Sequence, residues 1–202
     1  MELSVERAAA TAGGRRVLEP APSNPWRCVR RSYAYEGRGF RVRRDAVIRP
    51  DGTSGDYEFA EVASSFSVVV AVDEDRQVYL VRQWRYPWEQ SSWEAPAGHL
   101  EAEEGPLEAA KRELAEEAGL VATSWQQLAT LRNSASITAQ SYLFLARALR
   151  PVATRREASE GDMVIRRLPL DDALTAVAAG EIVHAVTISA LFLAERALAD
   201  PS

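Results

Sequence analysis

The sequence contains little cysteine, little lysine and no long hydrophobic run. Its one cysteine, Cys28, excludes an internal disulfide and is typical of a protein kept in a reducing cytosol. Lys111 is the only lysine among 24 basic residues, so an arginine by itself does not indicate a phosphate site. The longest aliphatic run, "VVVAV" at 68–72, is far too short to span a bilayer. The amino terminus carries Glu2 and Glu6 and no apolar segment, so we expect a cytoplasmic protein without a secretory signal.

The composition is that of an ordinary globular protein, with 47% hydrophobic and 26% charged residues. A chain of 202 residues can bury a full core, and this length favours one domain with an appendage over two equal domains. The formal net charge of -5 provides no bulk attraction to nucleic acid or to an anionic membrane surface. We therefore expect neither of these among its partners.

Hydrophobic patterning divides the chain into three segments. Residues 1–25 are rich in Ala, Gly and Pro without a sustained period, which predicts a flexible lead-in. Over 26–62, apolar and aromatic residues alternate with arginines, which predicts two or three antiparallel strands with a turn near Asp51. Residues 63–202 mix strand and helix patterns and form the main domain. The expected architecture is an α/β sandwich preceded by an amino-terminal β extension.

Within the main domain, "SFSVVVAV" predicts a buried strand, and "QVYLVRQW" its partner across a "DEDR" turn. Pro87 and Pro96 predict that the segment between them is mostly loop. A helix follows, with Pro106 in its first turn and Gly119 just past its end. Strands are expected at about 125–133, at about 141–148 and at "MVIRRL", and helices from about residues 170 and 187.

The first of these helices gathers three carboxylates on one side. At about 100° of rotation per residue, Glu113, Glu116 and Glu117 fall within an arc of about 100°, beside a separate apolar stripe. Arg112 can pair with Glu116, but it leaves Glu113 and Glu117 without a favourably placed partner. A solvated acidic face is the simple alternative. Grouped carboxylates are stable around a hard cation, so the helix predicts a Mg²⁺ or Mn²⁺ site for phosphoryl chemistry.

These residues also carry a family resemblance. Gly98, Glu104 and the run "RELAEEAGL" at 112–120 resemble the Nudix box at every fixed position. The approach "VYLVRQWRYPWEQSSWEAPAGHLE" and the later stretch "VIRRLPLDDALTAVAAGEI" are similar to the ADP-ribose pyrophosphatase branch of that family. The resemblance implies a Nudix-type α/β/α sandwich with a mixed sheet. It also implies metal-dependent hydrolysis of a nucleoside diphosphate sugar, with ADP-ribose giving AMP and ribose 5-phosphate.

The resemblance implies a metal shell as well. Glu113 and Glu117 match the main ligands of the family, Glu116 matches a further ligand, and the carbonyl of Ala97 matches a backbone ligand. The expected cofactor is Mg²⁺, with Mn²⁺ as the alternative.

The resemblance also implies structural roles for four further residues of the box. Glu104 and Arg112 match the pair that braces the loop against the helix. Gly98 and Gly119 match structural glycines, where a side chain would obstruct the backbone.

Candidate substrate contacts lie around the box. Arg85 matches a basic residue that relatives use on the diphosphate, and Arg82 is a second candidate that need not act together with it. Phe40 lies where relatives place an aromatic ring against adenine. Trp84, Trp88 and Trp93 either stack a nucleobase or anchor the packing of the Pro-rich loop. His99 and His184 have no ligand-like spacing, so we expect them to be structural or exposed.

Two departures leave the substrate open. Relatives that prefer ADP-ribose commonly carry a Ser-Pro-Gly-like loop that ends in an acidic residue, whereas this chain has "NSASITAQ" and ends in Gln140. GDP-mannose, another nucleotide sugar or a dinucleotide therefore stay as alternatives. A nucleotide-sugar sensor without turnover is a third reading, although this sequence keeps all the box carboxylates.

Two further expectations come from the resemblance. Relatives place a mobile acidic general base on the loop before the final strand, and Glu160 in "REASEGDM" is closest to that position, with Glu116 as the fallback. In related pyrophosphatases the amino-terminal strands cross to a second subunit, which predicts a homodimer.

Overall fold

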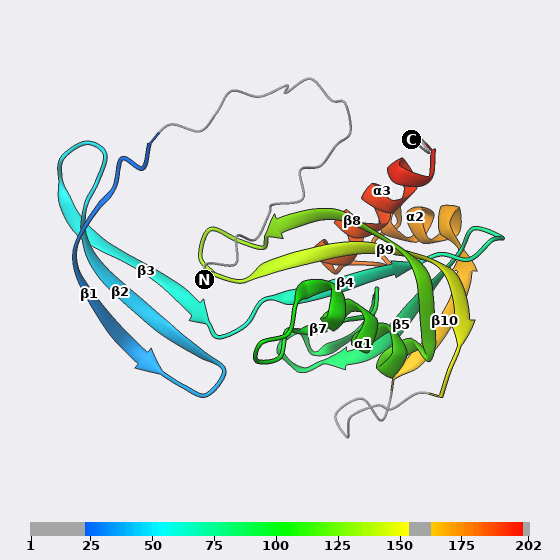
Figure 1. Ribbon diagram of the computed structural model, residues 1–202. Helices are drawn as coiled ribbons and strands as arrows, with labels where there is room; N and C mark the ends of the chain where they lie inside the picture. Colours follow the sequence, from blue (N-terminus) through cyan, green and yellow to red (C-terminus); the bar gives the residue numbers. More distant parts are fainter. Residues whose placement is uncertain (1–22, 154–162, 200–202) are drawn as a thin grey trace.

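A computed structural model describes residues 23–153 and 163–199 of the chain. It consists of an α/β body and a three-stranded sheet that projects to one side of it (Figure 1). The projecting sheet is antiparallel in the order β1-β2-β3, formed by β1 (Arg27–Glu36), β2 (Phe40–Ile48) and β3 (Ser54–Val62). The expected amino-terminal β extension is thus confirmed. Its second turn includes Gly52 at a φ of 85°, a conformation that favours glycine.

Among the described residues, the body contains two sheets. Its strands are β4 (Phe66–Ala71), β5 (Gln77–Arg85), β6 (Gln90–Glu94), β7 (Ala97–His99), β8 (Leu120–Arg132), β9 (Gln140–Pro151) and β10 (Val164–Pro169). One sheet has the order β7-β4-β9-β8 and the other the order β10-β5-β6. β4 runs parallel to β9 and antiparallel to β7, so the predicted mixed sheet is confirmed.

Of two predictions about the approach to the box, one holds only at its turn and the other is wrong. The chain does turn at "DEDR", where Val72 and Val78 form an antiparallel bridge and Asp73 N–H donates to Gln77 O at 3.1 Å. Beyond this bridge β4 and β5 do not pair: β4 lies between β7 and β9, and β5 lies between β10 and β6. The segment between Pro87 and Pro96 is not mostly loop, because it begins within the short 3-10 turn Tyr86–Trp88 and contains β6. The prolines lie outside the paired strands, where a missing backbone N–H removes no ladder hydrogen bond.

The helices cover both faces of the sheet around β4. Helix α1 (Pro106–Ala118) packs against Val69 and Ala71 on one face. Helices α2 (Leu170–Ala178) and α3 (Ala185–Ala199) pack on the other face, in the core that contains Val68 and Val70. Alternate residues of β4 therefore pack in two different cores, one on each face of the sheet, which gives the α/β/α layering. No helix in the described ranges is long and apolar enough to cross a membrane.

The extension is joined to the body by the loop between β8 and β9. The backbone N–H of Ala60 donates to Ser136 O at 2.8 Å, and Thr138 N–H donates to Ala60 O at 3.0 Å. The Thr138 hydroxyl oxygen accepts a hydrogen bond from Val62 N–H at 3.1 Å. The loop that departs from the Ser-Pro-Gly pattern thus holds β3.

Candidate active site

Helix α1 presents the acidic cluster to the body. Pro106 is its first residue, and Gly119 follows its last turn with a φ of 63°, donating its N–H to carbonyls of that turn. This left-handed residue ends the helix as the sequence predicts. The apolar stripe of α1 is buried against β4, which turns Glu113 and Glu117 toward β7 rather than toward solvent. The residues Glu113 and Glu117 are only 7% and 2% exposed.

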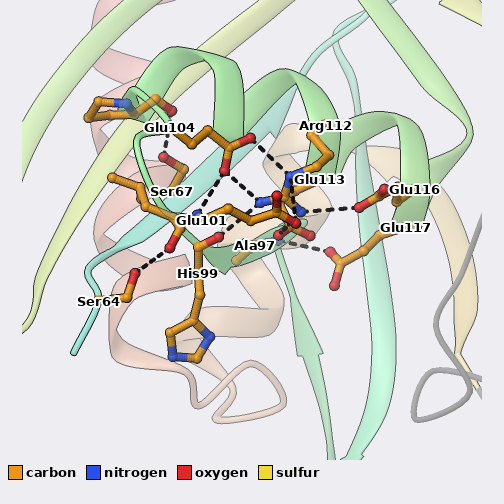
Figure 2. Close-up of polar contacts among 12 residues, drawn as sticks. Ser64, Ser67, Ala97, His99, Glu101, Glu104, Arg112, Glu113, Glu116 and Glu117 are labelled. Carbon is orange, nitrogen blue, oxygen red and sulfur yellow. Dashed lines mark hydrogen bonds and ion pairs between the residues drawn. The ribbon is translucent and has the colours of Figure 1, made fainter. Parts of the chain in front are cut away.

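Arg112 holds the carboxylates and the preceding loop together (Figure 2). Its guanidinium donates twice to Glu104, at 3.0 and 2.9 Å, and once to the carbonyl of His99 at 2.9 Å. The same group reaches Glu113 at 2.6 Å and Glu116 at 3.1 Å. The prediction that Arg112 leaves Glu113 without a partner is therefore wrong. These contacts, with the bond to Glu104 foremost, hold the pKa of Arg112 above its usual value.

Glu104 completes the brace. Its carboxylate accepts from Arg112 and from the backbone N–H of Glu101 at 3.0 Å. The hydrogen bond from Arg112 is the main cause that holds the pKa of Glu104 below its usual range. The loop is pinned from the other side by the Ser64 hydroxyl, which donates to Leu100 O at 2.6 Å. The loop between β7 and α1 is therefore rigidly placed.

Gly98 lies against the carboxylate of Glu113. A Cβ atom at position 98 would lie 1.8 Å from Oε1 of Glu113 and 2.1 Å from its Cδ. No side chain of any size fits beside a carboxylate in that position. The glycine is thus needed for a close approach of β7 to α1.

Ala97, on the same strand β7 as Gly98, lies beside Glu117 of α1. Its backbone N–H donates to Oε2 of Glu117 at 2.8 Å. Glu113, Glu116, Glu117 and Ala97 all line one cavity of about 480 Å³, which is mostly polar. Within residues 23–153 and 163–199, however, no three acidic, His or Cys side chains are gathered in ligand geometry. Arg112 and the Ala97 N–H engage the same carboxylates instead.

The donor set nevertheless fits a hard divalent cation. The cavity offers carboxylate oxygens from three glutamates, and Mg²⁺ and Mn²⁺ prefer oxygen ligands. When bound, such an ion polarises a phosphoryl oxygen and acidifies a water. Binding would require the glutamates to exchange contacts with Arg112 and with the Ala97 N–H for contacts with the ion.

Arg85 lies at the edge of this cavity, held by a glutamate that sequence reasoning missed. Its guanidinium donates to both oxygens of Glu94, at 2.8 and 2.5 Å. The Glu94 side chain is 1% exposed. Burial works against its charge, but the hydrogen bonds from Arg85 hold the pKa of Glu94 below its usual range. The polar segment "QSSWE" around Glu94 was expected to be mostly loop, so it carried no signal of this burial.

A second cavity of about 340 Å³ adjoins the first. Arg85, Ala97, Gly98 and His99 line both. The second cavity also contains Trp88, Asn133, Ser141 and His184, with apolar walls from Phe66, Val68 and Val186. The site thus has an acidic compartment and a neutral compartment, with Arg85 between them.

Two of the other predicted substrate residues, Arg82 and Phe40, lie away from the two cavities. Arg82 stacks over the ring of Trp93 at 5.4 Å, and Trp93 packs on the core. Phe40 is 46% exposed on the extension, where it packs against Tyr35 with ring centroids 5.6 Å apart. In the described part of the chain, neither Arg82 nor Phe40 lines the two cavities. Trp84 lines the acidic compartment and Trp88 the neutral one. Glu160 lies outside the described residues.

Comparison with family profiles identifies two matching regions. The profile described as NUDIX domain matches residues 62–190. The profile described as nucleoside diphosphate sugar hydrolase N-terminal domain matches residues 26–59. The first includes the acidic helix and both compartments, and the second includes most of the β extension.

Known relatives are similar over most of the chain. An ADP-ribose pyrophosphatase of Mycobacterium tuberculosis is 36% identical over 159 residues, covering 77% of this chain and 76% of that protein. An ADP-ribose pyrophosphatase of Bacillus subtilis is 28% identical, covering 81% and 89%. A crystal structure of an ADP compounds hydrolase superposes with a TM-score of 0.79 at 21% identity, covering 89% of this chain and 97% of that one.

Proposed function

Because the chain belongs to the Nudix hydrolase family, we propose that it hydrolyses the diphosphate of a nucleotide sugar, with ADP-ribose as the substrate. The observation that carries the proposal is the placement of Glu113, Glu116 and Glu117 in one cavity, with Arg85 at its edge. Diphosphate carries charge that a protein of net charge -5 repels unless cations and arginine offset it. Cleavage of ADP-ribose yields AMP and ribose 5-phosphate.

The same carboxylates support Mg²⁺ as the cofactor. Glu113 and Glu117 are buried beside β7, so an ion there would have a fixed position relative to Arg85. Glu116 is more exposed, with a side-chain exposure of 34%, which suits a ligand that joins when substrate binds. Arg112 and Glu104 hold the loop and helix in register around the ion.

The proposed function is tested by release of the nucleoside monophosphate (AMP from ADP-ribose, GMP from GDP-mannose) across a panel of nucleotide sugars and dinucleotides with Mg²⁺. We expect ADP-ribose to be cleaved with the highest kcat/KM, and EDTA to abolish the activity. Preference for GDP-mannose or a dinucleotide would retain the chemistry and change the substrate. Tight binding of a nucleotide sugar without turnover would instead indicate a sensor.

The general base stays a prediction from the sequence. Loss of a positioned base lowers a rate by about 10²–10⁴. We therefore expect Glu160→Gln to reduce kcat within that range with little change in Mg²⁺ affinity, and Glu157→Gln, its neighbour in the same segment, to do less. Initial rates over a Mg²⁺ titration measure both quantities. Wild-type kcat in both variants would move the role elsewhere, with Glu116 as the next residue to test.

We also propose that the protein is a homodimer whose extension meets the body of the second subunit. The extension exposes Trp26, Tyr33, Tyr35 and Phe40, and a group of exposed aromatic side chains marks an interaction surface. Phe40 lines neither compartment of its own subunit, so a role against adenine requires a partner. Light scattering at micromolar concentration is expected to give twice the chain mass of 22.2 kDa. A fully active species of single-chain mass would refute this arrangement.

A further inference from the structure

His184 has no role in the proposed diphosphate chemistry, although a buried network links it to Glu94, the partner of Arg85. Its Nδ1 lies 2.9 Å from the hydroxyl oxygen of Thr187 and 3.2 Å from Oε2 of Glu94. Thr187 is fully buried, and its hydroxyl oxygen also accepts the backbone N–H of Ala95 at 3.0 Å. The imidazole is therefore fixed in position at the start of α3, against the strand that leads to the box.

The network determines which ring nitrogen carries the proton. A carboxylate only accepts hydrogen bonds, so a lone pair on Nδ1 of His184 facing Glu94 would be repelled. A proton on Nδ1 instead satisfies both Glu94 and Thr187. Burial holds the pKa of His184 below its usual value against the opposing charge of Glu94, so the ring is neutral at pH 7. Its Nε2 is then a hydrogen-bond acceptor.

The acceptor belongs to the neutral compartment of the site. His184 lines that cavity, and within the part of the chain that the structure describes its Nε2 has no hydrogen-bond partner. Asn133 lines the same cavity, where its Oδ1 accepts from the Ser141 hydroxyl at 2.9 Å. That bond leaves the amide N–H groups of Asn133 as donors. The compartment thus offers a neutral acceptor and a neutral donor beside apolar walls.

A hydroxyl both donates and accepts, so this pairing matches a sugar rather than a phosphate, which only accepts. We propose that His184 determines specificity by accepting a hydrogen bond at Nε2 from a hydroxyl of the substrate's terminal sugar. This inference rests on the proposed function and names the part of the substrate that the second compartment takes. Arg85 stands between the compartments, so the diphosphate lies on one side of it and the sugar on the other.

The experiment compares two substrates that share the ADP half. One is the ADP-sugar of the panel that is cleaved best, and the other is the propyl ester of ADP, which has no sugar hydroxyls beyond the diphosphate. For the wild type we expect kcat/KM to be at least about tenfold higher for the nucleotide sugar, since a site built for hydroxyls rejects analogues that lack them. In His184→Phe, kcat/KM for the nucleotide sugar is expected to fall about 10–100-fold, because the loss of one buried hydrogen bond is of that size. The ester should lose much less, so the preference collapses.

Val183→Ala is the matched control, since Val183 is the exposed neighbour of His184 and does not line the compartment. It should retain the preference for the nucleotide sugar. An equal loss on both substrates in His184→Phe would mean that the histidine acts only through Glu94 and Arg85, and would overturn the proposal. Should His184→Phe fail to fold, His184→Gln takes its place and should show the same selective loss of kcat/KM on the nucleotide sugar. A wild-type ratio of kcat/KM between the nucleotide sugar and the ester that is near one would also overturn the proposal. Absence of turnover on the whole panel would reject the proposed function itself.

Discussion

Glu117→Gln is expected to lower kcat by about 10²–10³ or more while leaving the fold intact. Glu117 is 2% exposed and faces the cavity shared with Glu113 and Glu116. An amide keeps the shape of the side chain but loses the charge that holds a divalent cation, and such an ion contributes several kcal/mol to phosphoryl transfer. Each 1.36 kcal/mol corresponds to a factor of ten in rate. The rate should be measured at saturating Mg²⁺, beside the thermal midpoint.

The fold should tolerate this change for two reasons. The amide oxygen of Gln can still accept the Ala97 N–H, and one charge fewer reduces repulsion among the carboxylates. Glu108→Gln is the control, because Glu108 lies on the same helix with a side-chain exposure of 64% and pairs only with Lys111 among the described residues. Near-normal turnover in Glu117→Gln would contradict a metal site at this position. Gross unfolding would show that the carboxylate is needed for structure instead.

Gly98→Ala should also remove most activity, because it would displace the carboxylate of Glu113 without changing its charge. Its Cβ would lie 1.8 Å from Oε1 of Glu113, so either that carboxylate or β7 must move. Forced displacements of this kind typically cost about 1–3 kcal/mol of stability. Displacing a cation ligand is expected to reduce kcat by about 10² or more, since positions within the site must hold to about 0.5 Å. Steady-state kinetics and thermal melting measure the two effects.

Gly105→Ala provides the comparison for this prediction. Gly105 precedes α1 with a φ of -75°, and a Cβ there would meet no atom within 4 Å. We expect wild-type kcat and only a small change in melting temperature for this variant. If Gly98→Ala kept a wild-type kcat as Gly105→Ala is expected to do, the close approach between Gly98 and Glu113 would have no importance for activity.

The local signals of the sequence predicted α1 well, because they depend on neighbours in the chain. Pro106 begins the helix and Gly119 ends it, and the apolar stripe that includes Leu114 is buried as its period indicates. The three strands of the extension follow from alternation and from the Asp51 turn. In each of these cases the signal lies within the element itself or in the turn between two consecutive strands.

Strand pairing in the body could not be read in the same way. The adjacent strands β4 and β5 look like a hairpin, but β4 pairs with β9, which follows the helix, and β5 pairs with β10. A strand's hydrophobic pattern shows which face is buried and not which strand lies at its edge. β7 has only three residues, too few to show a hydrophobic alternation in the sequence.

The same limit applies to the site. The box carboxylates are contiguous on one helix and could be assigned by resemblance, whereas His184 shows no ligand-like spacing. His184 is 90 positions from Glu94 in the chain, and only the folded structure brings the two side chains together. The same folding buries Glu94 beside Arg85. Arg82 and Arg85 are close in sequence, yet Arg82 stacks on Trp93 while Arg85 faces the cavities.

The position of β4 has a consequence for how the body opens. Val69 and Ala71 belong to the core under α1, and Val68 and Val70 to the core under α2 and α3, so neither core can separate without breaking the same strand. Native-state hydrogen exchange should therefore give the β4 amides protection equal to the global free energy of unfolding, with both cores lost in one cooperative event. The amides of β1 and β2, which touch neither core, should exchange through smaller openings of their own.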